Sequence, residues 1–304
     1  METVPETAPE TAPETEPETE PETEILNEGC FPENNSVLML ANEDVYLWYS
    51  TYHDRRNRSD YYFKKHKDLY DPNSVTFSWK VNEKAGNYTL YISTDEQFSE
   101  DKTQSYSVDT NSLTLSHLFI GTTYYWYVLC TESSVNSEET STYSVHPMQF
   151  STAESPRWVK IDGVSNTRDI GGYPAAEGYR VKQGMVYRGG QLEDITDEGK
   201  DYFLNVLGIK TDFDIRGGGI SASVLGDNVN YVNLSGRYYV GDDGAGIDSD
   251  EGKAVVAQAI RVFAEPSNYP IYLHCAVGRD RTGTLAFSAG GTIGCTAGRF
   301  VRGI

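Results

Sequence analysis

Apolar and polar residues alternate along residues 69–154, with turn residues between the alternating segments. Every second residue of such a segment faces a core, which is the pattern of a half-buried strand. Short strands at this spacing predict a β-sandwich over residues 69–154. The clearest alternating positions are Val75, Phe77, Trp79, Tyr88, Leu90 and Ile92.

From residue 155 to 304 the pattern changes to apolar runs that alternate with helical stripes. One helix is predicted after Thr196, a good N-cap, and ends at Gly208. Another is predicted over Asp248–Ala264, before Pro266. This alternation predicts an α/β domain over residues 155–304 in which helices cover a sheet. The expected strands are Trp158–Ile161, Met185–Tyr187, Ile209–Ile215, Asn230–Leu234 and Ile271–Leu273.

The N-terminal part has no such pattern. Residues 1–24 repeat Pro, Glu and Thr, which predicts a disordered, self-repelling tether. Residues 25–68 form a poorly defined elaboration, in which Asn42 could cap a helix. The basic and aromatic run 55–67 could bind a polyanion, but a solvated face is favoured.

Charge and cysteine content narrow the function classes. The 304-residue chain has a net charge of −20; nine Glu of the tether account for part of it, which leaves −11 elsewhere. An acidic chain without a basic block argues against nucleic-acid binding and against an anionic membrane surface. No apolar run approaches the roughly 18 residues of a membrane helix.

Four cysteines at irregular spacing give neither a zinc pattern nor a dense disulfide framework. We therefore expect no metal and no cofactor. A Cys30–Cys130 bridge stays open, and unpaired core thiols are favoured.

The richest chemistry lies where the last predicted strand ends. The strand Ile271–Leu273 runs into His274 and Cys275, followed by a loop with Gly278 and then by Arg281-Thr282-Gly283. A strand, a tight loop and a helix start direct backbone N–H groups at a bound anion.

Arg281 can complete the grip with a bidentate contact, and the positive field lowers the pKa of Cys275 from about 8.5 towards 3.5–7.5. A thiolate beside a bound phosphate is a nucleophile for phosphoryl transfer. The alternative is a buried, inert cysteine beside a helix start.

The pattern His-Cys-x5-Arg-Thr-Gly resembles the signature of the cysteine-dependent tyrosine phosphatases, above all a bacterial branch with Asp before the Arg. Three further segments, 166–172, 186–190 and 208–216, resemble motifs of that branch. The resemblance implies that loop residues bind the phosphate: Ala276, Val277, Gly278, Arg279, Thr282 and Gly283. Supporting roles, structural rather than chemical, are expected for His274, Asp214, Arg216, Arg168 and Asp169.

The implied reaction has two steps. Cys275 attacks phosphorus while a general acid protonates the leaving oxygen, and water then hydrolyses the cysteinyl-phosphate. The resemblance implies Asp280 as the acid; Asp214 is the second candidate and the Asp242-Asp243 pair the third. Thr282 could donate to the sulfur, and Arg279 could favour doubly charged or inositol phosphates.

Residues 69–154 resemble a fibronectin type III domain, which implies a spacer, a docking module for a surface partner or a lid. This combination of domains implies a secreted or cell-surface protein, with a cytoplasmic protein as the alternative; no signal peptide is present in this sequence. The C-terminal part departs from the phosphatase pattern, because four Gly follow Ser288 where a long apolar helix is expected. The sequence therefore predicts an incomplete C-terminus and impaired catalysis relative to a full-length relative.

Three functions compete. The first is a phosphatase that acts on a phosphorylated protein or a small phosphoester. The second is a non-catalytic surface module with a damaged phosphatase domain that only recognises phosphate or a partner. The third is a rhodanese-type sulfurtransferase, against which Arg281-Thr282-Gly283 and the Arg168-Asp169-Ile-Gly-Gly segment both argue.

Overall fold

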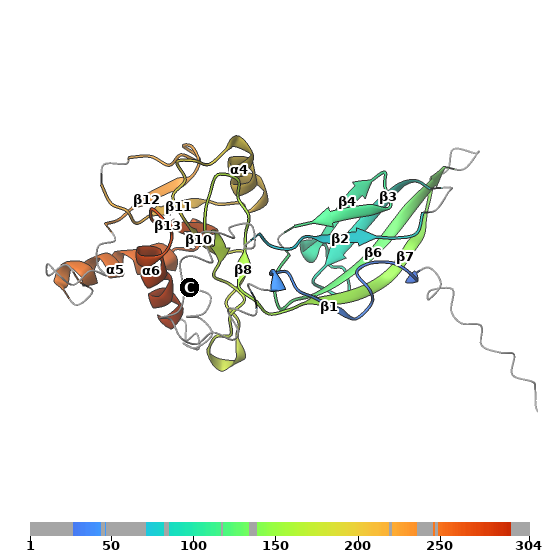
Figure 1. Ribbon diagram of the computed structural model, residues 1–304, viewed down its shortest axis with the longest axis horizontal. Helices are drawn as coiled ribbons and strands as arrows, with labels where there is room; N and C mark the ends of the chain where they lie inside the picture. The colour runs from blue at the N-terminus through green and yellow to red at the C-terminus, as the bar shows by residue number, and fades with distance from the viewer. Residues whose placement is uncertain are drawn as a thin grey trace, which may run out of the picture.

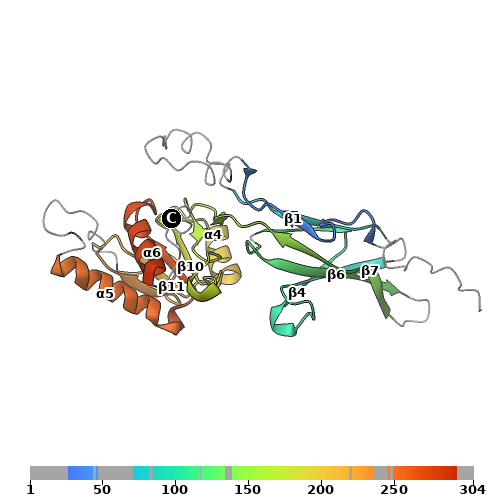
Figure 2. The same ribbon diagram turned by 90° about the horizontal axis from the view of Figure 1, so that it is seen from below.

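The computed structural model has two units side by side, a β unit and an α/β unit (Figures 1 and 2). The expected tether, the basic run 55–67 and the Asp242-Asp243 pair lie outside the described residues. The structure describes residues 27–43, 46, 71–81, 85–116, 118–133, 139–218, 221–235, 246 and 249–292.

The β unit contains a five-stranded sheet in the order β1-β7-β6-β3-β4 and a two-stranded sheet, β2-β5. All pairings are antiparallel except that of β1 with β7. The strands are β1 (Ser36–Leu38), β2 (Val75–Ser78), β3 (Ala85–Ser93), β4 (Thr103–Val108), β5 (Ser112–Leu115), β6 (Thr123–Ser133) and β7 (Glu139–Thr152).

The two sheets share one core. Phe77 of β2 packs edge-on against Trp126 and Phe150 of the larger sheet, at ring-centroid distances of 5.1 and 5.8 Å. Each of the six alternating positions that the sequence singled out is at most 5% exposed. The predicted period of two is therefore confirmed, and it reflects apolar side chains turned inward from both sheets.

Residues 27–43 belong to this β unit. Strand β1 pairs with β7, and Cys30 and Leu40 are buried in the core that β2 and β6 build. The expected boundary at residue 69 therefore differs from the structure. Strand β1 is too short to show a period in the sequence, and its partner strand β7 lies more than a hundred residues away along the chain. Neither Cys30 nor Cys130 forms a disulfide bond, and both side chains are buried in this core.

The α/β unit is built on a six-stranded sheet in the order β12-β11-β13-β10-β9-β8. The first four strands are parallel, and β9 is antiparallel to both its neighbours. The strands are β8 (Arg157–Trp158), β9 (Arg168–Asp169), β10 (Val186–Gly189), β11 (Thr211–Asp214), β12 (Asn230–Asn233) and β13 (Ile271–His274). The helices are α4 (Asp197–Asp201), continued by the π-helical η5 (Tyr202–Val206), then α5 (Asp250–Ala264) and α6 (Asp280–Thr292).

Helices cover both faces of this sheet, as the alternating pattern predicted. Ile271 and Leu273 of β13 pack in the cluster that contains α5 and α6. Tyr272, between them, points to the other face, where its ring centre lies 4.8 Å from that of Phe203 in η5. The central strand is therefore apolar on both sides and fully buried, which fixes the position of the segment that follows it.

Helix α6 corrects one expectation. It runs through Gly290 and Gly291 to Thr292, so the helix after the loop is not lost at the glycines. Leu285 and Ala286 are almost fully buried against the sheet. Their burial offsets a helix-propensity cost of about 1 kcal/mol for each Gly.

A loop of the β unit docks on the α/β unit. The backbone N–H of Ile120 donates to Gln183 Oε1 at 3.0 Å, and Gln183 Nε2 donates back to the Ile120 carbonyl at 2.9 Å. A Cβ on Gly172 would lie 2.8 Å from the Ile120 side chain, so the two units meet at a position where only glycine fits.

Arg157 links the two units through one buried side chain. Its Nε donates to the Leu118 carbonyl at 3.3 Å, and its guanidinium lies 4.6 Å from the centre of the Phe119 ring. The same guanidinium pairs with Asp169 at 2.5 Å. Burial alone would lower the pKa of Arg157, but the Asp169 carboxylate raises it. The β unit is thus anchored to β8 and, through Asp169, to β9.

Candidate active site

The predicted nucleophile sits at the carboxyl end of the central strand. Cys275 follows β13 directly, is 4% exposed, and precedes the loop that leads into α6 at Asp280. Strand β13 pairs with β10 on one side and β11 on the other. Ligands of open α/β sheets bind beyond such strand ends, so the fold supports the location that the sequence indicated.

Glycine is required at the middle of the loop. Gly278 has a φ of +68°, and a Cβ there would lie 2.3 Å from the carbonyl of Gly189 at the end of β10. Only glycine combines this backbone conformation with so close an approach. The loop therefore rests directly on the neighbouring strand end.

Three successive carbonyl groups of the loop are held from outside. The backbone N–H of Gln191 donates to Ala276 O at 3.1 Å. Asn166 Nδ2 donates to Val277 O at 3.0 Å and to Gly278 O at 3.2 Å, and Arg188 Nη2 donates to Gly278 O at 2.5 Å. Because C=O and the following N–H point in opposite directions across a trans peptide, the next N–H groups turn the other way.

Those N–H groups reach the cysteine. Burial alone would raise the pKa of Cys275, but hydrogen bonds from the Thr282 hydroxyl and from the backbone N–H groups of Thr282, Val277 and Gly278 lower it below its ordinary value. The Thr282 hydroxyl is buried, and among the described residues no partner meets full hydrogen-bond geometry with it. The loop thus favours the thiolate form of Cys275.

Thr282→Val is expected to raise the pKa of Cys275, because it removes a hydroxyl donor while nearly preserving the side-chain volume. At pH 6 the rate of alkylation of Cys275 by iodoacetamide should fall about tenfold, because the loss of one hydrogen bond to a charged group has an effect of this size. Thr282→Ser keeps the hydroxyl and should retain the rate. Cys30 gives an internal reference, because burial raises its pKa. An unchanged pH profile in Thr282→Val would show that the hydroxyl does not stabilise the thiolate.

His274 orients the strand end. Its Nε2 lies 2.8 Å from Asp212 Oδ1, and its ring stacks on Tyr272 with an interplanar angle of 22°. Ser223 donates to the other oxygen of Asp212 at 2.6 Å. His274 is thereby fixed behind the loop, which supports its expected structural role.

Asp214 and Arg216 form a second support. The fully buried Asp214 carboxylate accepts from Arg216 Nε and Nη2 and from the Tyr231 hydroxyl at 3.0 Å. Burial opposes ionisation, but the bonds from Arg216 lower the pKa of Asp214. The carbonyl of Arg216 in turn accepts from Arg281 Nη1 at 3.2 Å. This pair therefore helps to direct the guanidinium expected to bind phosphate.

Arg168 and Asp169 serve opposite sides of β9. The Arg168 guanidinium lies 4.5 Å from the centre of the Trp158 ring and donates to Asn166 Oδ1 at 3.2 Å. Asp169 accepts from the backbone N–H groups of Gly171 and Gly184 as well as from Arg157. Both contacts are structural, as we expected.

The remaining predicted residues lie on the loop and the start of α6. Ala276, Val277, Arg279 and Asp280 are exposed, whereas Thr282 and Gly283 are buried. The structure therefore places Cys275, Arg281 and Asp280 on one continuous segment.

Sequence reasoning gave no role to three polar residues behind the loop: Asn166, Arg188 and Asp212. All three were inside quoted motifs, but Asn166 and Arg188 contact residues about 90 to 110 positions away, and Asp212 contacts His274, which is 62 positions away. The sequence offered one signal for Arg188: a charged residue inside an otherwise uncharged, buried strand indicates that its side chain has a specific partner.

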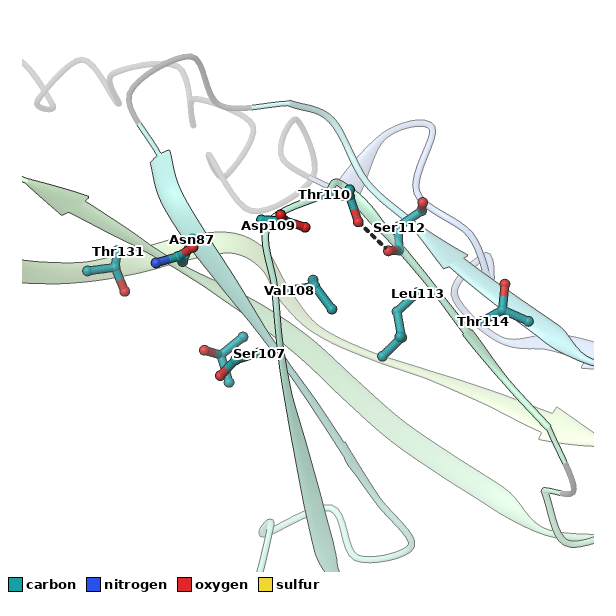
Figure 3. Close-up of a pocket in the computed structure, with 10 residues that line it drawn as sticks. Asn87, Ser107, Val108, Asp109, Thr110, Ser112, Leu113, Thr114 and Thr131 are labelled. Carbon is teal, nitrogen blue, oxygen red and sulfur yellow. Dashed lines mark hydrogen bonds between the residues drawn. The ribbon is translucent and has the colours of Figure 1, made fainter. Parts of the chain in front are cut away.

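A separate hollow lies in the β unit between β4 and β5 (Figure 3). Hydroxyl and amide side chains dominate its lining, and Thr110 Oγ1 donates to the Ser112 carbonyl at 2.9 Å. No residue of its lining belongs to the loop around Cys275. It is therefore distinct from the candidate active site.

The described residues lack two features, a membrane-spanning helix and a cluster of metal ligands. None of their helices has the length and apolar character that a membrane crossing requires. Their His, Cys, Asp and Glu side chains form no group of three or more that could hold a metal ion.

The sequence model of the tyrosine phosphatase family matches residues 159–299. No curated protein matches the chain. Among solved structures, the chain is similar to the core catalytic domain of the PP-IP phosphatase SIW14 from S. cerevisiae, in complex with citrate, with a TM-score of 0.28 and 16% identity. The similarity covers 42% of this chain and 66% of that one, and so weak a likeness says nothing about activity.

The matched segment contains β9 to β13, the loop and all of α6. It thus includes the cysteine, the arginine and the residues that hold the loop. The match of residues 159–299 to the tyrosine phosphatase family supports a cysteine-based phosphatase domain and phosphatase function in the α/β unit of this chain.

Proposed function

We propose that the α/β unit hydrolyses phosphomonoesters, either phosphotyrosine in proteins or small phosphoesters, through a cysteinyl-phosphate. The observation that carries this proposal is the orientation of the loop: its carbonyl groups are held from outside, so its N–H groups turn toward Cys275, where they lower the pKa of the thiol and would bind phosphate. A thiolate and an oxyanion site in one loop are the two requirements of this chemistry.

In the first step the Cys275 sulfur attacks phosphorus. The S–P bond forms, the bond from phosphorus to the ester oxygen breaks, and Asp280 gives that oxygen a proton. In the second step water attacks phosphorus and gives a proton to Asp280, the S–P bond breaks, and the thiolate leaves. Thr282 stabilises the departing sulfur, and Arg281 with the loop N–H groups holds the equatorial oxygens throughout.

Asp280 is a better acid candidate than Asp214. Asp214 is fully buried, bound to Arg216 and Tyr231, and has a lowered pKa, so it holds its charge rather than a transferable proton. Asp280 is exposed at the first residue of α6, next to the loop.

Asp280→Asn should lower kcat for alkyl phosphates by about 10²- to 10³-fold, and for para-nitrophenyl phosphate by less, because nitrophenolate needs little protonation to leave. Turnover measured over a series of leaving groups checks this. Equal losses for all leaving groups would contradict acid catalysis by Asp280.

The proposed function is tested by hydrolysis of para-nitrophenyl phosphate between about pH 5 and 7. Turnover that vanadate blocks, with a phosphate-mass adduct on the Cys275 peptide after an acid quench, is the expected result. Vanadate binding without turnover would instead favour a module that only recognises phosphate. Thiosulfate sulfurtransferase activity in place of phosphate release would overturn the proposal.

Further proposals rest on sequence resemblance alone. These are membership of the bacterial branch with Asp before the Arg, a fibronectin type III-like β unit that binds a surface partner, and a secreted or cell-surface location.

A further inference from the structure

We propose that Asn166 and Arg188 are positioning residues that hold the loop's peptide groups in the orientation required to bind phosphate. The inference rests on the proposed function, because phosphate binding is what gives that orientation its purpose. Neither side chain is assigned to contact the substrate; both act on carbonyl oxygens at the back of the loop.

The geometry of the peptide bond carries the first step. The carbonyl oxygens of Val277 and Gly278 accept from Asn166, so the N–H groups of Gly278 and Arg279 point to the opposite side. The N–H of Gly278 is among the groups that lower the pKa of Cys275, which shows that this opposite side is the sulfur side.

Without these donors the loop could adopt another backbone conformation. Because Gly278 has no Cβ and a φ of +68°, the peptide planes beside it can rotate at little steric cost. A rotated plane would turn a carbonyl oxygen toward the thiolate and the phosphate, and would remove an N–H donor from both. Donors behind the loop oppose that rotation.

Both donors are themselves fixed. Arg188 is fully buried in β10, a strand hydrogen-bonded to β13 and β9, and its Nη2 also lies 3.4 Å from Arg279 O. Asn166 is held in the left-handed region, with a φ of +61°, and accepts from Arg168. The loop is therefore aligned by a sheet strand on one side and by a strained turn on the other.

The positive φ of Asn166 provides a clean experiment. Asn166→Gly removes the side-chain donor and is compatible with the backbone, so the fold should be retained. We expect kcat for para-nitrophenyl phosphate to fall about 10- to 100-fold, since small misplacements of a catalytic group have effects of this size. The vanadate Kd should rise by a similar factor, and alkylation of Cys275 at pH 6 should slow.

Arg188→Lys is the companion variant, which keeps the charge but loses the planar fork. The matched controls are Asn230→Gly, at an exposed asparagine on β12 that bonds to Asn268, and Arg180→Lys, at a partly exposed arginine bonded to Glu154. Both controls should retain the wild-type vanadate Kd and alkylation profile.

The outcomes separate this inference from the proposed function. An active wild type with an equally active Asn166→Gly, unchanged in vanadate Kd and alkylation, would overturn the inference and leave the function standing. A wild type without turnover, in which Asn166→Gly still weakens vanadate binding or slows alkylation, would support the positioning role and sink the phosphatase proposal. Should Arg188→Lys fail to fold, Asn166→Gly alone decides.

Discussion

Cys275→Ser is expected to lower kcat for para-nitrophenyl phosphate by on the order of 10⁴-fold or more, because removal of a nucleophile typically has effects of that size or larger. A serine hydroxyl is not ionised by the hydrogen bonds that lower the pKa of the Cys275 thiol. Oxygen in place of sulfur keeps the loop's shape, so the variant should still bind vanadate or phosphate. Initial rates and a vanadate titration measure the two effects separately.

Cys130→Ser is the matched control, since Cys130 is another buried cysteine without a disulfide bond but lies in the β unit, where its sulfur is 3.3 Å from Thr142 Oγ1. A hydroxyl can keep that contact, and turnover should be unchanged. Residual turnover in Cys275→Ser within tenfold of the wild type would contradict the cysteinyl-phosphate route.

Asp169→Ala is expected to destabilise the protein by about 3–5 kcal/mol, because it leaves the buried Arg157 guanidinium without its carboxylate. The substitution also removes the acceptor of the Gly171 and Gly184 N–H groups. Urea unfolding followed by circular dichroism gives the change in unfolding free energy, and the wild type and variant should unfold with similar m-values.

The control for this variant is Asp71→Ala, which breaks an ion pair between the two units. Asp71 pairs with Lys160, but both side chains are partly exposed, so the loss should be at most about 1 kcal/mol. Equal destabilisation by the two substitutions would show that burial does not make the Arg157–Asp169 pair more important for stability than an exposed pair.

The sequence was most informative where the chemistry is contiguous. The strand before Cys275, the loop glycine and the start of α6 are all local features, so their order along the chain already specifies a strand–loop–helix site. The alternation of Val75, Phe77 and Trp79 was equally decisive, because one buried sheet face imposes a period of two.

The sequence was misleading where a local propensity competes with burial. The glycines after Ser288 are poor helix formers, yet α6 continues through Gly290 and Gly291 to Thr292, with Leu285 and Ala286 packed against the sheet. The sequence did not indicate strand β1, because three residues are too few to show a period. Its partner β7 is more than a hundred residues away, so no local pattern predicts the pairing.

By itself the sequence predicted the candidate nucleophile, the loop that surrounds it, the guanidinium at its end and the helix-covered sheet, because these predictions follow from local spacing and periodicity. Only the tertiary structure decided how the loop's carbonyls are held by Asn166 and Arg188, and that Asp214 is an ion-pair partner rather than a free acid. Such contacts join residues far apart in the chain, and no local pattern encodes which distant donor will meet a given carbonyl oxygen.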